Sequence, residues 1–414
     1  MNKLSEPTRE SGGRWCAGQG DHLDVPARLR HQSWWAALLL FSPWLLSIFL
    51  SWSIIYSQPF GVIGLLPGLA VAAHIVLCLS FNLASNHRPF QEEHLFPALG
   101  AANWITLLRA AAIVAMAAIL PFALHSDTGV FEPDTLAWAC GIIYLGISLF
   151  DLLDGYVARK QKRETVLGKQ LDTVTDASGL LVASLLAVTL GRLPVIYLLV
   201  GLAYYPFIFA IWLRRRWALP VVALQSRPYA RIIAGFQMGL VAMALMPIFK
   251  PAFTYLAAYI FMTPLLIGFA RDWLVVSCRI KTDGNQQSRL DLWLRSLVIT
   301  PLPLALRLII FSGGITTLVG SGFLHTHLSC QIIHSFCCLL AAIGFMGRSS
   351  ALFLVLLLGS NQSPFGITVL SMALFSTAAA LMLSGTGILS LWRPEDTILY
   401  RRNKKRSRTA CEAI

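Results

Sequence analysis

The chain has 414 residues, of which 56% are hydrophobic and only 13% are charged, and its formal net charge is +13. This composition is too apolar for an ordinary soluble domain. It excludes a soluble globular protein and predicts an all-α, polytopic membrane protein. We expect no nucleic-acid partner, because loops on one side of a membrane and anionic lipid headgroups account for the positive charge.

Twelve apolar runs predict about twelve transmembrane helices. The polar and basic residues 1–32 precede a first run that is too long for the core of a signal peptide, so we expect that run to stay as an anchor. The run at 349–360 is the shortest, and a tilted or re-entrant helix is an alternative there. The runs lie near residues 34–55, 61–84, 104–124, 135–153, 173–191, 194–213, 232–249, 252–270, 299–320, 329–346, 349–360 and 365–391.

Lys and Arg residues are concentrated in alternate connections between these runs. If twelve helices alternate, the clusters fall on the side of the N-terminus, whereas the acidic connection 125–134 falls on the other side. Positive loops face the cytoplasm, so we expect both termini to be cytoplasmic, in a bacterial inner membrane. The basic clusters lie near residues 159–169, 214–227, 279–289 and 401–408.

Four aspartates surround the connection between the fourth and fifth runs. Asp151 and Asp154 are three residues apart and Asp172 and Asp176 are four apart, so each pair projects from one helix face. Carboxylates this close repel one another unless cations neutralise them, and hard cations such as Mg²⁺ or Mn²⁺ favour carboxylate oxygen. The aspartates therefore predict a site for one or two divalent metal ions.

Small residues and an arginine accompany the acids. Gly155 allows a ligand to approach the backbone, Ala158 keeps the next turn of the helix narrow, and the guanidinium of Arg159 suits a phosphate group. Together with a metal, they predict a bound pyrophosphate.

These residues resemble the signature of the CDP-alcohol phosphatidyltransferases, D-x2-D-G-x2-A-R-x8-G-x3-D-x3-D. The resemblance covers about residues 100–275. It implies divalent-metal-dependent transfer of a phosphatidyl-type group from a CDP-linked lipid, CDP-diacylglycerol, to an alcohol acceptor, with release of CMP. Every fixed position is present: Asp151, Asp154, Gly155, Ala158, Arg159, Gly168, Asp172 and Asp176.

The same resemblance implies a role for each residue. Asp176 would also take the proton from the acceptor hydroxyl, as a general base. Arg159 would steady a phosphate. The groove for the cytidine and the phosphates would be shaped by Gly155, Ala158 and Gly168. The metal ligands would be Asp151, Asp154, Asp172 and Asp176.

Two further sets of polar residues are candidates for substrate contacts. At the start of the third run, Asn103, Thr106 and Arg109 recur every third residue. They resemble the N-x2-T-x2-R pattern of many family members, which implies contact with the CDP-lipid; a helix cap with a snorkelling arginine is the alternative. For the acceptor, the candidates near the sixth and seventh runs are Arg214, Arg215, Arg227 and Arg231, for which a purely topological role is the alternative.

The remaining sequence is expected to surround this core. We predict a cytoplasmic N-terminus (1–32), two extra helices with an interfacial segment (33–100), the transferase core (101–275), a cytoplasmic linker (276–296), a four-helix module (297–392) and a basic tail (393–414). The four-helix module resembles a DoxX-type membrane module through its glycine-rich motifs. An unrelated accessory bundle is the alternative.

Two other classes of function fit some of these features. A cation transporter would place its acids near the membrane midplane along a path, whereas these lie at one end of two helices. A non-catalytic lipid-binding scaffold would not need a complete signature. We therefore expect an enzyme whose partners are the CDP-lipid, the alcohol, membrane lipids and a second copy of the chain.

Overall fold

The computed structural model is built of helices throughout the part of the chain that it describes. Its described residues are 25–55, 66–89, 91, 94–124, 132–222, 224, 228–280, 301–320, 328–387, 389–392 and 394–395. Within them, strand-like pairing is limited to isolated bridges. The prediction of an all-α fold is confirmed. The helices are α1 (Ala27–Ile55), α2 (Leu66–Phe81), α3 (Ala101–Leu124), α4 (Pro133–Lys160), α5 (Val166–Thr189), α6 (Leu198–Leu202), α7 (Tyr204–Arg216), α8 (Pro228–Leu245), α9 (Pro251–Val276), α11 (Pro301–Gly320), α12 (Leu328–Ile343), α13 (Gly347–Gly359) and α14 (Val369–Ser384).

Five of these helices are long and apolar enough to cross a membrane by length and composition, namely α1, α3, α4, α5 and α9. The segment 195–216 would make a sixth, but it bends by 45° between α6 and α7 instead of forming the single helix that the sequence predicts. The other apolar helices, α2, α8 and α11 to α14, have 13–20 residues, and their apolar stretches of 10–17 residues are shorter than the roughly 20 that a straight span needs. Within the described residues, each predicted apolar run contains at least one α-helix, and the run near 194–213 contains two, but a count of twelve spans is not established.

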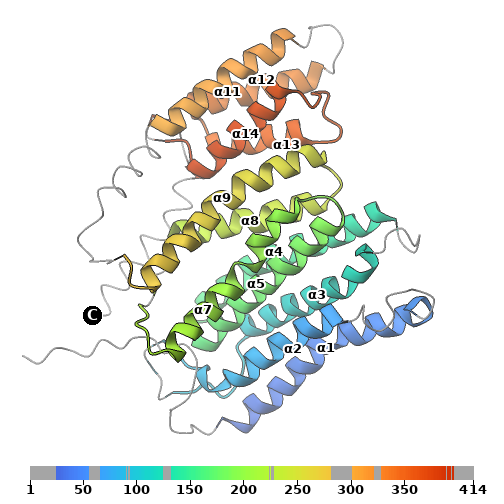
Figure 1. Ribbon diagram of the computed structural model, residues 1–414, viewed down its shortest axis with the longest axis vertical. Helices are drawn as coiled ribbons and strands as arrows, with labels where there is room; N and C mark the ends of the chain where they lie inside the picture. Colours follow the sequence, from blue (N-terminus) through green and yellow to red (C-terminus); the bar gives the residue numbers. More distant parts are fainter. Residues whose placement is uncertain are drawn as a thin grey trace, which may run out of the picture.

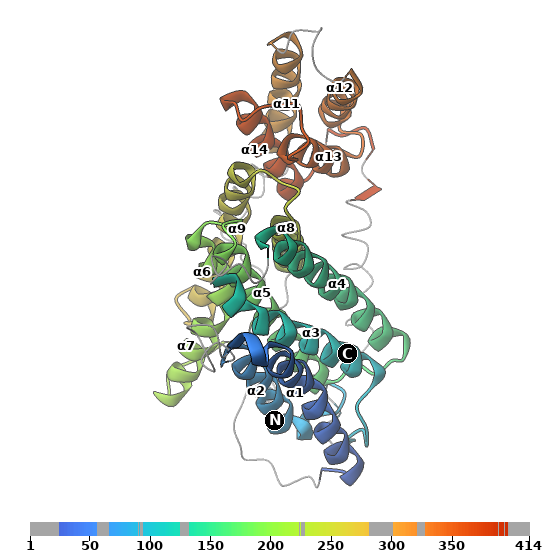
Figure 2. The same cartoon turned by 90° about the vertical axis from the view of Figure 1, so that its right-hand side faces the viewer.

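The helices lie side by side, and their order in space largely follows the chain (Figure 1). The helices α1 and α2 lie at one end, α3 to α9 in the middle, and α11 to α14 beyond α8 and α9 at the other end, as a second view also shows (Figure 2). Many large apolar side chains remain exposed, among them Phe49, Phe81 and Ile267. Lipid would cover such a surface, so the fold supports an integral membrane protein.

Small residues let the central helices approach closely. A Cβ atom at Gly201 would lie 2.9 Å from the Cα of Leu181, and one at Gly179 would lie 2.9 Å from the side chain of Ile113. Packing of this kind is typical of helices in lipid, where the hydrophobic effect does not drive helices together. It fixes α5 against α3 and α6, and α5 carries two of the four aspartates.

The last four helices form their own apolar core, which continues onto α9. Phe253 of α9 packs against Phe375 of α14, with ring centroids 4.9 Å apart. Arg307 of α11 is buried and donates to the carbonyls of Ala342 (2.7 Å) and Leu389 (2.5 Å). This packing fits a four-helix module, whereas its resemblance to the DoxX type stays a prediction.

Candidate active site

The four aspartates come together where α4 ends and α5 begins. Asp151 and Asp154 lie in the last three turns of α4, and Asp172 and Asp176 lie in the first three turns of α5. The short connection 161–165 turns the chain back, so that the two acidic faces oppose each other. Thr165 caps the start of α5, because its hydroxyl accepts a hydrogen bond of 2.9 Å from the backbone N–H of Gly168.

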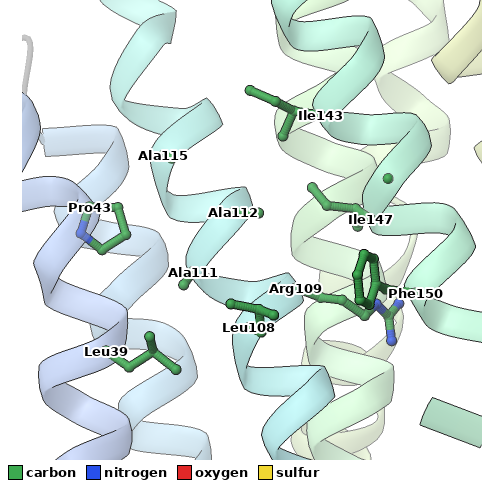
Figure 3. A pocket seen from close by; sticks show the side chains of 11 residues that line it. Leu39, Pro43, Leu108, Arg109, Ala111, Ala112, Ala115, Ile143, Ile147 and Phe150 are labelled. Carbon is green, nitrogen blue, oxygen red and sulfur yellow. The ribbon is translucent and has the colours of Figure 1, made fainter. Parts of the chain in front are cut away.

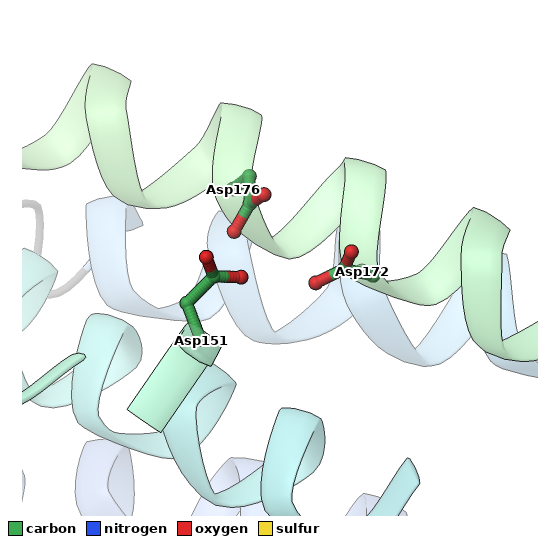
Figure 4. Close-up of side chains that lie close together, drawn as sticks. All are labelled: Asp151, Asp172 and Asp176. Carbon is green, nitrogen blue, oxygen red and sulfur yellow. The ribbon is translucent and has the colours of Figure 1, made fainter. Parts of the chain in front are cut away.

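Three of the carboxylates are close enough to share an ion. Oxygen atoms of Asp151, Asp172 and Asp176 all lie within 4.8 Å of one another, and the side chains point toward a common space (Figure 4). Ligands on opposite sides of a Mg²⁺ or Ca²⁺ ion are about 4–5 Å apart, because each metal–oxygen distance is about 2.0–2.6 Å. These three of the four predicted aspartates therefore fit a divalent cation, with oxygen ligands of the kind that such ions prefer.

Asp154 has a different environment from the other three. It is buried, and its Oδ2 accepts hydrogen bonds from the hydroxyl of Thr106 (3.0 Å) and from Nη1 of Arg109 (2.6 Å). It does not belong to the group whose oxygens lie within reach of one ion. Its predicted role as a metal ligand thus stays a prediction, and the structure adds a hydrogen-bonded link from α4 to α3.

Arg109 occupies the centre of the site. Its guanidinium forms ion pairs with Asp151 (3.0 Å), Asp154 (2.6 Å), Asp172 (3.1 Å) and Asp176, and only 1% of its side chain is exposed. One positive charge cannot neutralise four ionised carboxylates, and uncompensated charge is costly away from water. The remaining negative charge is of the size that one or two divalent cations would balance.

The sequence predicted a different partner for Arg109. The N-x2-T-x2-R pattern implies contact with the CDP-lipid, and the structure shows Arg109 and Thr106 bound to the acids themselves. The alternative of a snorkelling arginine is wrong, because Arg109 is buried. The sequence signal that could have revealed this pairing is a single arginine within an otherwise apolar run, because a cation inside a membrane helix needs a partner such as a carboxylate.

Gly168 lies where α5 meets α3. A Cβ atom at this position would lie 2.6 Å from Oδ1 of Asn103 and 3.0 Å from Oγ1 of Thr165. The close approach of the two helices is one reason for a glycine here, and its predicted role in a nucleotide groove stays a prediction. Asn103 itself is buried, and its Nδ2 makes no hydrogen bond within the described part of the chain. This amide is therefore free to donate to a ligand.

The remaining signature residues follow Asp154 along α4. A Cβ atom at Gly155 would lie 3.0 Å from Nη1 of Arg159, so the side chain of Arg159 folds back over the glycine one turn earlier. Ala158 is half-buried and Arg159 is exposed. An exposed guanidinium beside the acids is accessible to a phosphate group.

The structure places the four acceptor candidates differently. Arg214 donates to the carbonyls of Pro220 (2.9 Å) and Ser277 (3.2 Å), so it joins the end of α7 to the end of α9. Arg215 is exposed at the end of α7, and Arg227 lies outside the described residues. Arg231 begins α8 and is near enough to Asp151 for their charges to interact. Of the three described arginines, Arg231 is the one that the fold brings to the acids.

Comparison with known families agrees with this arrangement. Residues 99–284 match the model of the CDP-alcohol phosphatidyltransferase family. No curated protein and no solved structure matches the chain. The match includes α3 to α9 and every residue of the acidic site, whereas α1, α2 and the last four helices lie outside it.

Proposed function

We propose that the chain is a membrane enzyme that transfers a phosphatidyl group from CDP-diacylglycerol to an alcohol, with release of CMP. The proposal starts from the match of residues 99–284 to the CDP-alcohol phosphatidyltransferase family, whose members transfer a substituted phosphate group from a CDP-alcohol to a second alcohol in lipid synthesis. The observation that carries the proposal is the set of four aspartates around Arg109. It supplies the charge and the oxygen ligands that a metal-dependent reaction of a pyrophosphate needs.

The metal would be Mg²⁺ or Mn²⁺, held by Asp151, Asp172 and Asp176, with Asp154 close by. When bound, it would offset the charge of the pyrophosphate and of the departing CMP. Arg109 would hold the carboxylates in position, because its two terminal nitrogens contact all four of them. Thr106 would fix Asp154 through its hydroxyl.

Asp176 would act as the general base. Its Oδ1 contacts Arg109, which orients the carboxylate, and the side chain is still 37% exposed. Its second oxygen would take the proton of the acceptor hydroxyl, and the acceptor oxygen would attack the phosphorus that carries the diacylglycerol. The bond from that phosphorus to the bridging oxygen then breaks, and its electron pair leaves with CMP. Arg159, exposed beside Gly155, would bind a phosphate oxygen of the nucleotide.

The site would face the cytoplasm. The acids lie at the last turns of α4 and the first turns of α5. Four basic residues lie at the end of α4, in the connection and in the first turn of α5, namely Lys160, Lys162, Arg163 and Lys169. Basic connections favour the cytoplasmic side. A position at one end of the bundle also disfavours a transporter, whose ion sites lie near the midplane.

Release of CMP tests the proposal. The purified full-length chain, given CDP-diacylglycerol, Mn²⁺ and a panel of alcohols, should release CMP in step with a new phospholipid. Asp176→Asn should lower this release by about 10²–10⁴-fold, as expected for loss of a general base. The matched control is Asp134→Asn at the other end of α4, whose side chain is 66% exposed and pairs with Arg192, and it should retain activity. A transporter or a scaffold would release no CMP with any alcohol.

A further inference from the structure

A short stretch of chain between α2 and α3 contacts the connection that joins the two acidic helices. We call this stretch, residues 86–88 and 96–98, the bracing loop. Asn86 is fully buried and holds its two halves together. The side-chain Nδ2 of Asn86 donates to the carbonyls of Phe96 (3.0 Å) and Ala98 (3.2 Å), and its main-chain carbonyl accepts from the N–H of Phe96 (2.9 Å). The bracing loop is therefore a closed unit.

The bracing loop binds the backbone of the connection at both ends. The carbonyl of His87 accepts from the N–H of Val166 (3.0 Å), the first residue of α5. This hydrogen bond satisfies a donor that has no partner within its own helix. The side chain of Arg88 donates to the carbonyl of Lys162 (3.0 Å). Lys162 has a left-handed backbone with φ of 51°, which is uncommon for a residue other than glycine and depends on support from its surroundings.

Arg163 reaches back from the connection to the bracing loop. Its guanidinium lies over the ring of Phe96, 4.7 Å from the ring centroid, and its Nη2 donates to the carbonyl of Ala98 (3.3 Å). The guanidinium of Arg88 lies 5.8 Å from the centroid of the same ring. An aromatic face attracts cations. Two arginines, one from the bracing loop and one from the connection, therefore share the ring of Phe96.

The bracing loop is itself fixed to helices that precede the family match. The backbone N–H of Leu99 donates to Oε1 of Gln32 in α1 (2.7 Å). Leu83 and Leu99, which flank the bracing loop, share a buried core with Leu171 of α5. Leu171 directly precedes Asp172. Because the match begins at residue 99, this support for the acidic helices comes from outside it.

The spacing of the two acidic pairs depends on how α5 is held against α4. Side-chain tips lie about 5–6 Å from a helix axis, so a rotation of α5 by about 10° would move its carboxylates by roughly 1 Å. Mg²⁺ requires nearly ideal octahedral geometry with oxygens at about 2.0–2.1 Å, whereas Ca²⁺ accepts irregular sets of oxygens at about 2.3–2.6 Å. A movement of that size would therefore weaken the binding of Mg²⁺ more than that of Ca²⁺.

We propose that the bracing loop sets the separation of the two acidic pairs, and that Arg88 and Arg163 are positioning residues for the metal site. The inference rests on the proposed function, because the metal ion belongs to it. Both arginines bind backbone carbonyls and the ring of Phe96, so they act through the connection between α4 and α5. The sign of their effect separates positioning from charge. Loss of a nearby positive charge strengthens the binding of a dication, whereas loss of positioning weakens it.

Metal affinities of the purified full-length chain test the inference. Free Mn²⁺ is measured by electron paramagnetic resonance, and Mg²⁺ and Ca²⁺ are measured by competition with Mn²⁺. The double variant Arg88→Gln/Arg163→Gln should bind Mg²⁺ roughly tenfold more weakly, the lower end of the loss that follows removal of groups that orient metal ligands. Its affinity for Ca²⁺ should fall by about twofold.

The matched control is Lys160→Gln/Lys169→Gln. It removes the same charge close to the connection, both lysines are exposed, and within the described residues neither side chain hydrogen-bonds to the bracing loop. Its affinities for Mg²⁺ and Ca²⁺ should equal or exceed those of the wild type. Unchanged Mg²⁺ affinity in the arginine variant, or an equal loss in the lysine variant, would overturn the inference.

A double-mutant cycle separates positioning from a general loss of stability. Phe96→Leu removes the shared ring without changing the charge. Measured well below the Tm of each variant, Phe96→Leu and Arg163→Gln should each lower Mg²⁺ affinity, and the combined variant should lower it little further, because both remove the same contact. Losses that add would overturn the inference. Absence of Mn²⁺ binding by the wild type would refute the metal site of the proposed function as well, whereas Mn²⁺ and Mg²⁺ binding that every variant retains would refute the role of the bracing loop alone.

Discussion

Replacement of Arg109 should destabilise the metal-free protein and make its thermal stability depend on a bound metal ion. Arg109→Gln keeps a polar side chain of similar length but leaves four carboxylates without their cation. The pair with Asp154 is the most buried of the four, with 1% and 7% of the two side chains exposed, whereas Asp172 and Asp176 are 41% and 37% exposed. Exposed pairs contribute about 0–1 kcal/mol each, but breaking a buried pair costs about 3–5 kcal/mol because an uncompensated charge remains.

This cost converts into a measurable shift. For a domain of about 150–250 residues, the size of the segment 99–284 that carries the site, 1 kcal/mol corresponds to about 2–4 °C in Tm. A loss of about 3–5 kcal/mol therefore corresponds to roughly 6–20 °C. The assay is thermal unfolding of the detergent-purified chain in EDTA and in Mn²⁺. Because a divalent cation can replace the missing charge, Mn²⁺ should raise the Tm of Arg109→Gln more than that of the wild type.

The control for this prediction is Arg192→Gln. Arg192 pairs with Asp134 (2.5 Å), whose side chain is 66% exposed, so its loss should cost only about 0–1 kcal/mol and should not depend on Mn²⁺. If Arg109→Gln melted within 2 °C of the wild type in EDTA, or gained no more from Mn²⁺ than the wild type does, the charge-balance reasoning would be refuted.

Three further outcomes follow from the same site. Excess EDTA should abolish CMP release and Mg²⁺ or Mn²⁺ should restore it, because without a metal ion the negative pyrophosphate is repelled by the carboxylates. Undiminished release in EDTA would contradict the metal assignment. Asp176→Asn should lower the transfer rate by about 10²–10⁴-fold while CDP-lipid still binds, as expected for loss of a general base, whereas Asp151→Asn should lose affinity for both Mn²⁺ and the donor. Measurements of Mn²⁺ and CDP-lipid affinity on both variants test this difference. Equal loss of metal affinity in both would show that Asp176 is a metal ligand like Asp151. Deletion of residues 297–414 should leave CMP release measurable, because every residue of the acidic site precedes the cut. It should lower the Tm, because Phe253 loses its contact with Phe375. A truncated protein that folds and binds lipid but does not turn over would show that the last four helices contribute to the site.

The sequence alone determined the features that depend on neighbours along one helix. The spacing of Asp151 and Asp154, and of Asp172 and Asp176, places each pair on one helix face because an α-helix has 3.6 residues per turn. The apolar runs likewise predicted the position of each helix, because a membrane segment must satisfy its backbone hydrogen bonds internally. These local patterns were enough to predict an acidic metal site and the resemblance to the family.

The tertiary structure decided which faces meet. The spacing of Asn103, Thr106 and Arg109 predicted a polar stripe on α3, but the stripe itself does not show that Arg109 contacts all four aspartates of α4 and α5. It was also not evident from the sequence that Leu39 of α1 lines the same apolar groove as Ala112 of α3 and Ile147 of α4 (Figure 3). The rotation and separation of helices in lipid are set by how side chains interlock between them, a property of pairs of helices that no single helical segment specifies.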